Sequence, residues 1–233
     1  FALTGGEPTL QPDFEGIVDH VLARPGTHVA VLTHGLGLLD RLDALERWPR
    51  DRVHWQISVE GSPEDHDRVR GRGRHEALLR VLDAMHTRRL PFTLTMAVGA
   101  GNARSMPAVV ELAHAHGAPM IVDNTVGTPA LLRPLARGAD VVIQSVTKTL
   151  TSSGFGIAGA VISRKNIVSK FGPDEMKADF AMYLKTLPNR DNGQNLSPMN
   201  AILSLNDMRT LRSKMDLMSR NTEQVAAFLD QHP

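Results

Sequence analysis

Short apolar segments alternate with amphipathic segments along the whole chain. In the first hundred residues the apolar runs have the length of strands, and they cover residues 2–4, 28–33, 53–59 and 92–98. The segments between these runs repeat apolar residues at helical spacing, which predicts helices at residues 12–23, 37–47 and 74–88. Strands that alternate with helices predict an α/β fold with mostly parallel sheets.

A second pattern of this kind follows after residue 118. Residues 119–123 form a short apolar run that ends in Asp123, and residues 140–145 form another that continues into Lys148. The intervening residues predict a helix that Thr128 caps, because hydroxyl side chains favour helix N-termini. We expect this helix to begin at Pro129 and to stop at Gly138.

Parallel strands of one βαβ unit end at the same edge of their sheet. Asp123 and Lys148 should therefore both lie at the carboxyl edge, where open α/β sheets bind ligands. The alternative is a plain ion pair between these two residues.

The boundary between the two halves is predicted from an interruption of the pattern. Residues 99–105 contain two glycines and small polar side chains, which is typical of a linker. A helix follows, with Ser105 as its expected N-cap and Gly117 just past its end. We therefore expect one domain at residues 1–98, a junction at 99–117 and a second domain at 118–233.

Composition narrows the classes of partner. A net charge of +1 gives no reason to expect a nucleic acid or an acidic membrane as partner. The arginine-rich segment 68–75 is interpreted as a solvated loop, since charge runs usually face water. No apolar run approaches the length of about 20 residues that spans a bilayer, and no signal peptide is visible. We expect a cytoplasmic protein without a membrane partner.

The chain contains no cysteine. This count excludes disulfides, thiolate zinc sites, cysteine nucleophiles and cysteine-held iron–sulfur clusters in these residues. His114 and His116 are two positions apart, which points them to different faces of a helix, so we expect surface or packing roles. No metal site is predicted.

Four motifs carry a resemblance to a known family. They are Val122-Asp123-Asn124-Thr125, Arg133-Pro134-Leu135, Gly138-Ala139-Asp140 and Ser145-Val146-Thr147-Lys148. Together they resemble the Cys/Met-metabolism enzymes that depend on pyridoxal phosphate (PLP), which include cystathionine γ-synthase, cystathionine lyases and O-acylhomoserine sulfhydrylases. The resemblance covers about residues 106–233 and implies part of the large domain of PLP fold type I.

The resemblance implies a role for each cofactor-binding residue. Lys148 would bond the cofactor covalently and later act as the proton shuttle. Asp123 would be the buried carboxylate that keeps the pyridine nitrogen protonated. Ser145 and Thr147 would bind the phosphate, and both would point one way if this segment is extended.

The implied reaction is γ-elimination or γ-replacement on a small amino-acid substrate, either an O-acylhomoserine or a cystathionine-like compound. A homo-oligomer is implied too. The sequence departs from the family in the hydroxyl-rich segment 149–153 and in Ser213-Lys214-Met215. The family's glycine turn for phosphate, its stacking aromatic and its substrate-binding arginine domain have no counterpart, so we expect an incomplete enzyme.

The first half carries a different resemblance. Thr4-Gly5-Gly6-Glu7-Pro8, followed by Ile57-Ser58-Val59-Glu60-Gly61, is similar to motifs of radical S-adenosylmethionine (SAM) enzymes. This implies a partial barrel at residues 1–98, in which Gly5, Gly6 and Glu7 hold the methionine amino group of SAM. The family's cluster-binding loop of three cysteines precedes the glycine motif, and this chain begins after it.

Three functions remain open from the sequence. The first is a PLP-dependent enzyme of sulfur amino-acid metabolism, present as an incomplete chain. The second is a fragment of a radical SAM enzyme that binds SAM. The third is a non-catalytic fusion of two fragments.

Overall fold

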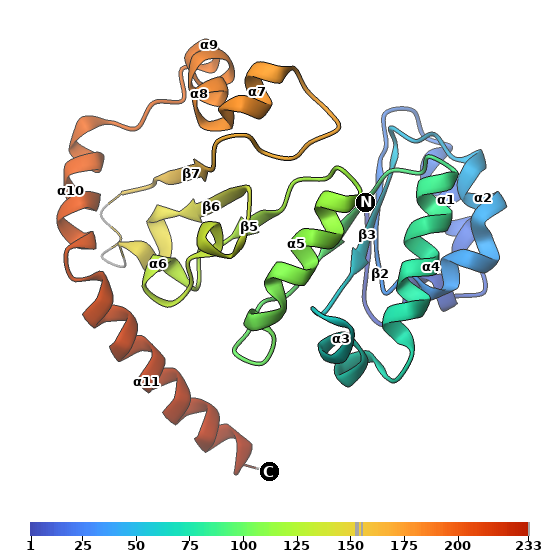
Figure 1. The fold of residues 1–233 in the computed structure, drawn as a ribbon, viewed down its shortest axis with the longest axis horizontal. Coiled ribbons are helices and arrows are strands. Elements are labelled where there is room, and N and C mark those ends of the chain that lie inside the picture. Colours follow the sequence, from blue (N-terminus) through green and yellow to red (C-terminus); the bar gives the residue numbers. More distant parts are fainter. Residues whose placement is uncertain (152–153, 155, 233) are drawn as a thin grey trace. The chain divides into compact units, whose positions relative to one another are not determined.

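The computed structural model of the protein describes residues 1–151, 154 and 156–232. Part of the hydroxyl-rich segment predicted to depart from the family, Ser152 and Ser153, lies outside the described residues. The chain divides into two compact units, Phe1–Val109 and Val110–Pro233. Each unit has its own sheet (Figure 1). The assignment of the junction to residues 99–117 stays a prediction.

The first unit is built on a parallel sheet in which the strands follow their order along the chain. The strands are β1 (Ala2–Leu3), β2 (Val29–Thr33), β3 (Val53–Ser58) and β4 (Phe92–Thr95). Its helices are α1 (Phe14–Leu22), α2 (Leu42–Arg47), α3 (Pro63–Arg70) and α4 (Arg74–Thr87), and α5 (Met106–Ala115) crosses the division between the units.

An aromatic cluster lies in the first unit's core. Trp55 in β3 stacks on Trp48 with ring centroids 6.1 Å apart, and Phe14 of α1 lies 6.3 Å from the same ring of Trp55. All three side chains are buried. Alternation along β3 places Trp55 and Ile57 on this face, because successive strand residues point to opposite faces.

Two expectations about the first unit are corrected in detail. The helix predicted at residues 37–47 consists of a 3-10 segment, Leu36–Arg41, followed by α2. Ser105 is the last residue of a 3-10 turn, Ala103–Ser105, and its hydroxyl donates to the Asp65 carboxylate. This side chain therefore ties the segment before α5 to α3, where we had expected a helix N-cap.

The second unit contains the predicted βαβ pattern. Its strands are β5 (Ile121–Asp123), β6 (Val141–Ser145) and β7 (Gly159–Ser163). β5 pairs with β6 in parallel, whereas β7 pairs with β6 in the antiparallel direction. The helices of this unit are α6 (Thr128–Leu131), α7 (Asp174–Ala178), α8 (Phe180–Leu184), α9 (Arg190–Asn192), α10 (Pro198–Met208) and α11 (Leu211–Asp230).

The helix predicted from Pro129 to Gly138 is wrong in its length. The Thr128 hydroxyl does accept from the Ala130 N–H at 3.3 Å, but the helix ends after one turn at Leu131. The backbone is already extended at Leu132, and Pro134 disfavours the helical region for the residue before it. A 3-10 turn, Pro134–Arg137, then ends at Gly138, whose φ of 97° suits glycine.

A buried carboxylate joins three segments at the start of β6. Asp140 is fully buried, and it accepts from the His114 ring at 2.6 Å and from the Met120 N–H at 2.8 Å. The Val168 N–H donates to its other oxygen at 3.3 Å. His114, for which we expected a surface or packing role, instead hydrogen-bonds to this buried carboxylate.

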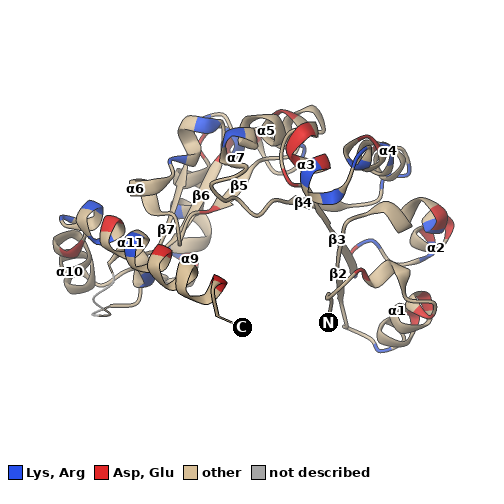
Figure 2. Ribbon diagram, turned by 90° about the horizontal axis from the view of Figure 1, so that it is seen from below, with Lys and Arg blue, Asp and Glu red and all other residues tan. Residues whose placement is uncertain are grey.

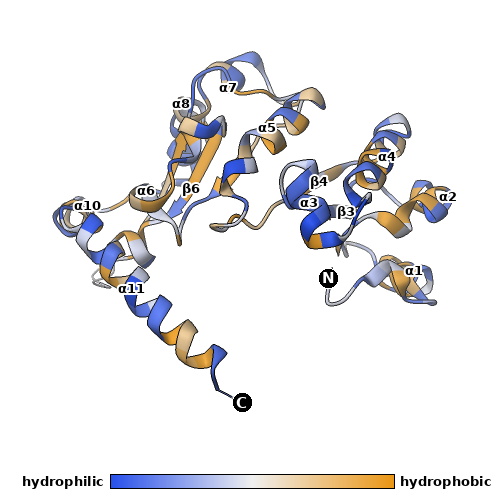
Figure 3. Cartoon of the chain, turned by 60° about the horizontal axis from the view of Figure 1, so that its bottom comes forward, coloured by the Kyte–Doolittle hydropathy of each residue, from blue (hydrophilic) through white to orange (hydrophobic). Residues whose placement is uncertain are grey.

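The side chains of β6 are largely apolar, whereas charged residues gather on the helices (Figures 2 and 3). The sheet of the second unit nevertheless leaves apolar side chains exposed on one face. Ile121, Ile143 and Val161 are 52%, 43% and 44% exposed.

Among the described residues, no helix is both long and apolar enough to cross a bilayer.

Candidate active site

The carboxyl ends of β5 and β6 lie side by side at one edge of the second unit's sheet. Asp123 is the last residue of β5 and is opposite Ile143 of β6. Ser145 follows Ile143 by two positions, so the alternation of strand side chains puts it on the same face as Asp123. Lys148 comes three residues later, in the turn that leaves β6. The expected meeting of these residues at one edge is what the structure shows.

Hydrogen bonds and charge act together on Asp123. The hydroxyl of Thr125 lowers the pKa of the Asp123 carboxyl most, and the Thr125 N–H, which donates at 2.9 Å, adds to the effect. The positive charge of Lys148 lowers the pKa further, which places the amine within electrostatic range of the carboxylate. Asp123 is therefore ionised at neutral pH.

The expectation of a buried carboxylate is wrong for Asp123, which is exposed. β5 is the outer strand of the described sheet, so no described strand covers its free side. Ile121, on the same face of β5, is 52% exposed as well. The carboxylate consequently depends on hydrogen bonds from its own segment rather than on burial for its orientation.

Lys148 lies exposed within a helical turn, Val146–Leu150. Its own backbone is not helical, with φ of −86° and ψ of −125°. Within the described part of the chain, its amine has no hydrogen bond or ion pair. Its charge acts on Asp123, whose pKa it lowers. Once it has lost its proton, an amine of this kind can bond a carbonyl carbon.

The two predicted phosphate-binding hydroxyls do not share one extended segment. Strand geometry ends at Ser145, because Val146–Leu150 turns helically, and the two-residue periodicity no longer relates Thr147 to Ser145. The Thr147 hydroxyl accepts from the Ala158 N–H at 2.8 Å and lies 3.2 Å from its carbonyl oxygen. Thr147 thus fastens the lysine turn to the segment before β7.

Thr125 makes several hydrogen bonds at this edge, and the sequence analysis gave it no role. Its hydroxyl accepts from the Ser145 N–H at 2.9 Å, and its backbone N–H donates to Asp123. Its carbonyl oxygen accepts from the Thr149 hydroxyl. The motif that contains it offered a signal, since an aspartate favours a local turn in which its carboxylate accepts from the backbone N–H two residues later.

The glycine–glutamate motif lies in the first unit, after β1. Gly5 and Gly6 have φ of 88° and 54°, a region that only glycine adopts readily. The side chain of Glu7 is buried, with only 7% of its surface exposed. Its carboxylate accepts from the hydroxyls of Thr9 and Thr33, and the backbone N–H of His34 donates to it at 2.8 Å.

These donors control the ionisation of Glu7. Burial is the largest influence and opposes ionisation, but the hydrogen bonds from Thr33, Thr9 and His34 outweigh it and lower the pKa of Glu7. Both carboxylate oxygens already have partners within the chain. The predicted role of Glu7 as an acceptor for an ammonium group stays a prediction.

The stability of the first unit should therefore depend on pH through Glu7. A carboxyl whose pKa is lowered by folding stabilises the folded state above its unfolded pKa, and this contribution disappears as pH falls through the folded pKa. Glu7→Gln should lose about 2 kcal/mol at pH 7, the value of hydrogen bonds to a charged group. Urea unfolding of both chains from pH 3 to pH 7 measures the difference, which should shrink toward acid. A constant difference would contradict this account.

No cluster of three or more histidine or acidic side chains suited to a metal ion occurs among the described residues. This finding concerns metal sites built from such side chains, and it has no bearing on Asp123 and Lys148 at the edge of the sheet.

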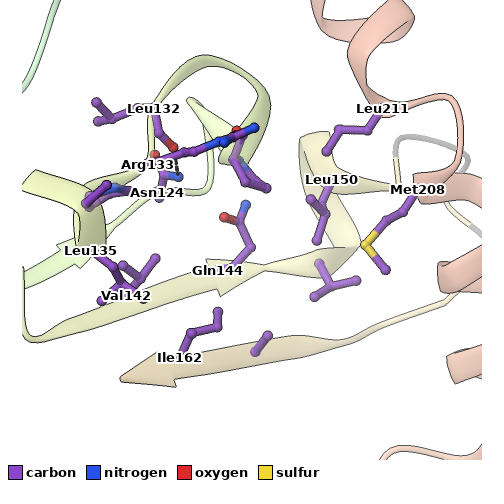
Figure 4. A pocket seen from close by; sticks show the side chains of 15 residues that line it. Asn124, Leu132, Arg133, Leu135, Val142, Gln144, Leu150, Ile162, Met208 and Leu211 are labelled. Carbon is purple, nitrogen blue, oxygen red and sulfur yellow. Dashed lines mark hydrogen bonds between the residues drawn. The ribbon is translucent and has the colours of Figure 1, made fainter. Parts of the chain in front are cut away.

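A cavity of about 560 Å³ lies on the other face of the second unit's sheet (Figure 4). Val142 and Gln144 of β6 and Ile162 of β7 form its floor, and Leu135, Met208 and Leu211 belong to its walls. Asp123 and Ser145 alternate with these floor residues and so point to the opposite face. The cavity is therefore separate from the lysine edge.

Comparisons with known protein families divide the chain close to the boundary between its two compact units. The family model for Cys/Met-metabolism PLP-dependent enzymes matches residues 92–233. The model for the Radical SAM superfamily matches residues 1–113. The two matches overlap across β4 and most of α5.

Curated relatives resemble 54% of the chain at moderate identity. L-methionine γ-lyase of Porphyromonas gingivalis is 39% identical over 128 residues, which is 29% of its length. O-acetyl-L-homoserine sulfhydrylase of Corynebacterium glutamicum is 36% identical over 149 residues, or 34% of its length. O-succinylhomoserine sulfhydrylase of Pseudomonas aeruginosa is 39% identical over 126 residues, or 28% of its length. The chain thus spans about a third of the length of these relatives.

A solved structure supports the fold. The crystal structure of a protein described as an O-acetylhomoserine (thiol)-lyase, from Campylobacter jejuni, aligns with 100% of this chain and 51% of its own. The TM-score is 0.53 and the sequence identity 22%. That protein contains N'-pyridoxyl-lysine-5'-monophosphate, a lysine joined to the cofactor.

Proposed function

Since this chain belongs to the family of Cys/Met-metabolism PLP-dependent enzymes, we propose that its second unit carries the PLP site of an enzyme of sulfur amino-acid metabolism. The observation that carries the proposal is an exposed amine at Lys148, without a partner among the described residues, near an ionised carboxylate at Asp123. These groups lie at the ends of adjacent parallel strands, the usual ligand-binding edge of such a sheet.

The residues present fit the polar ends of the cofactor. Asp123, which stays ionised at neutral pH, would hold a proton on the pyridine nitrogen. The Ser145 hydroxyl lies on the same face, so it would bind the phosphate, with Thr147 as the second candidate donor. The Lys148 amine would form the covalent bond to the cofactor, whose chemistry is to withdraw electrons from the substrate's α-carbon.

Lys148 has a second task when substrate replaces it on the cofactor. Its Nζ, released as a free amine, would accept the proton from the α-carbon of the amino acid and move a proton at the β-carbon. Loss of a γ-substituent follows these proton movements. We propose γ-elimination or γ-replacement on an O-acylhomoserine or a cystathionine-like amino acid, and the relatives' names include both a γ-lyase and sulfhydrylases.

Assembly and location are also proposals. The family's glycine turn for phosphate and its stacking aromatic have no match in these residues, and this chain spans only part of its relatives. A homo-oligomer, in which a neighbouring copy completes the site, is what we propose for the full enzyme. We propose a cytoplasmic location because the substrates are soluble metabolites.

Absorption spectroscopy tests the proposal. Addition of PLP to the purified chain should produce the absorption band of lysine-bound cofactor, and borohydride reduction should fix the cofactor's mass on the peptide that contains Lys148. Lys148→Ala should abolish the band and the labelled peptide entirely. Lys165→Ala is the matched control, because that lysine pairs with Asp179 away from the strand ends and its loss should change neither readout.

Two results would count against the PLP site. One is the absence of the band in the unmutated chain, which would favour a fusion without catalytic activity. The other is labelling that persists at the same level in Lys148→Ala, because the cofactor would then bond other amines.

Binding of SAM by Gly5, Gly6 and Glu7 is the second candidate function, and the Radical SAM family match favours it. The carboxylate of Glu7 would have to exchange an internal donor for the ammonium group of SAM. The chain contains no cysteine, so it does not hold a cysteine-ligated cluster by itself. We therefore place this function second, as ligand binding without reductive cleavage.

A further inference from the structure

Lys214 of α11 brings three oxygen atoms together around its ammonium group. Its Nζ donates to the Thr151 carbonyl at 2.8 Å and to the Asp207 carbonyl at 3.1 Å, and it forms an ion pair with the Asp207 carboxylate. An ammonium group has three N–H donors, so these oxygens use all of them. The side chain is only 23% exposed. One cation therefore connects the end of α10 with the residue that follows the lysine turn, Val146–Leu150.

Thr151 closes the turn that carries Lys148. Its hydroxyl donates to the Val146 carbonyl at 2.8 Å. Its backbone N–H reaches the carbonyl oxygens of both Val146 and Lys148. Because Lys214 holds the carbonyl of Thr151, this residue is hydrogen-bonded through both of its peptide groups. The path from the ammonium group of Lys214 to the backbone of Lys148 thus passes through a single residue.

Apolar packing between the turn and the two helices is incomplete. Leu150 of the turn, Met208 of α10 and Leu211 of α11 all line the cavity of about 560 Å³ (Figure 4). Side chains that border a cavity have no partner atoms on that side, so they gain less from dispersion forces. A hydrogen bond from a charged donor is stronger than a neutral one. The bond from Lys214 to Thr151 therefore carries much of the attachment of the turn to α11.

We propose that Lys214 is a positioning residue for Lys148, whose ammonium group clamps the Thr151 carbonyl to the end of α10 and so keeps the lysine turn closed. The inference deepens the proposed function and rests on it for the role of Lys148 toward the cofactor. Lys214 belongs to the segment Ser213-Lys214-Met215, in which the sequence departs from the family pattern. The clamp consists of this chain's own residues, so it can be tested without any cofactor.

The first test measures hydrogen exchange in the cofactor-free chain. Lys214→Met keeps the apolar stem of the side chain and removes its charge. The Thr151 N–H should then exchange about tenfold faster, because the turn opens more often, while the N–H groups of β6 keep their rates. Equal Thr151 rates in Lys214→Met and the unmutated chain would overturn the inference.

A second variant distinguishes the clamp from a plain contact between two helices. Asp207→Asn removes the charge of the ion pair and leaves Nζ of Lys214 its bond to the Thr151 carbonyl. The Thr151 N–H should therefore exchange at nearly the unmutated rate in Asp207→Asn. A rate as fast as that of Lys214→Met would also overturn the inference, since Lys214 would then only stabilise the corner between α10 and α11.

The second test measures the reaction of Lys148 with the cofactor. Titration with PLP should give a dissociation constant about tenfold weaker for Lys214→Met, equivalent to one hydrogen bond that involves a charged group. Asp207→Asn should bind PLP as the unmutated chain does. Lys177→Met is the matched control, because that lysine is 31% exposed and pairs with Asp174 within α7. Its loss should change neither the Thr151 exchange rate nor the binding of PLP.

The two tests separate the inference from the proposed function. If the unmutated chain forms no band with PLP, the proposed function fails, and the exchange rate of Thr151 still decides whether Lys214 closes the turn. If the band forms and Lys214→Met binds PLP as tightly as the unmutated chain, the inference fails alone. Should Lys214→Met not fold by circular dichroism, the same criteria apply to Lys214→Gln, whose uncharged side chain is shorter by one atom.

Discussion

Replacing Asp140 by alanine is expected to destabilise the second unit by about 3–5 kcal/mol, the cost of removing one partner from a buried pair. The Asp140 side chain is 0% exposed, and that of His114 is 24% exposed. The variant leaves the ring of His114 and the N–H groups of Met120 and Val168 without their acceptor. Buried donors without a partner lose their full hydration energy.

Hydrogen exchange with mass spectrometry can locate this effect. Peptides around β5 and β6 should lose protection in Asp140→Ala, while peptides of the first unit keep it. Both tryptophans of the chain, Trp48 and Trp55, lie in the first unit, so their fluorescence should change little. Asp174→Ala is the control within the second unit, because that carboxylate is 97% exposed. Equal protection in both variants would contradict a structural role for Asp140.

Replacing Trp55 by alanine is expected to cost the first unit about 3–5 kcal/mol, the range measured for large aromatic residues in cores. Trp55 is 2% exposed and contacts the rings of Trp48 and Phe14. Its removal leaves a cavity beside both rings and deletes the stacking geometry that aromatic pairs prefer. Relaxation of β3 cannot fill this space, because the strand is paired on both sides.

Urea unfolding followed by the remaining tryptophan, Trp48, measures this loss. The midpoint for Trp55→Ala should fall well below that of the unmutated chain, with red-shifted emission if the cluster opens. Leu79→Ala is the matched control in the same unit, since that side chain is 39% exposed and should cost far less. A Trp55→Ala midpoint equal to that of Leu79→Ala would show that the cluster is not the core.

The pattern of apolar residues predicted most strands to within a few residues. Runs such as Val29–Thr33 and Val141–Ser145 favour strands by their local sequence, and they are paired strands in the fold. Helix lengths were less predictable where a local signal competed. The helix that the apolar pattern alone extended to Gly138 ends at Leu131, and Pro134, which was visible in the sequence, disfavours its continuation.

The sequence predicted that Asp123 and Lys148 lie at one edge of the sheet, but it did not predict their environment. Asp123 and Lys148 followed from their places at the ends of two strands, because the topology of a βαβ unit brings such ends together. The exposure of Asp123 did not follow, because burial depends on what covers the strand. The hydrogen bond between Thr147 and Ala158 could not be predicted from the sequence either, because Ala158 lies just before β7, which comes later in the chain.

The sequence by itself determined the α/β pattern of both halves, the absence of cysteine, and the positions of Asp123 and Lys148 after two neighbouring strands; the cofactor roles of these two residues come from the family resemblance and are proposals. These are local properties, set by the spacing and the type of residues. The tertiary structure alone decided that Thr125 connects Asp123 to Ser145, that Asp140 is a buried acceptor, and that the apolar cavity faces away from the lysine. Each of these depends on hydrogen bonds or faces contributed by residues 20 or more positions apart, which no local pattern specifies.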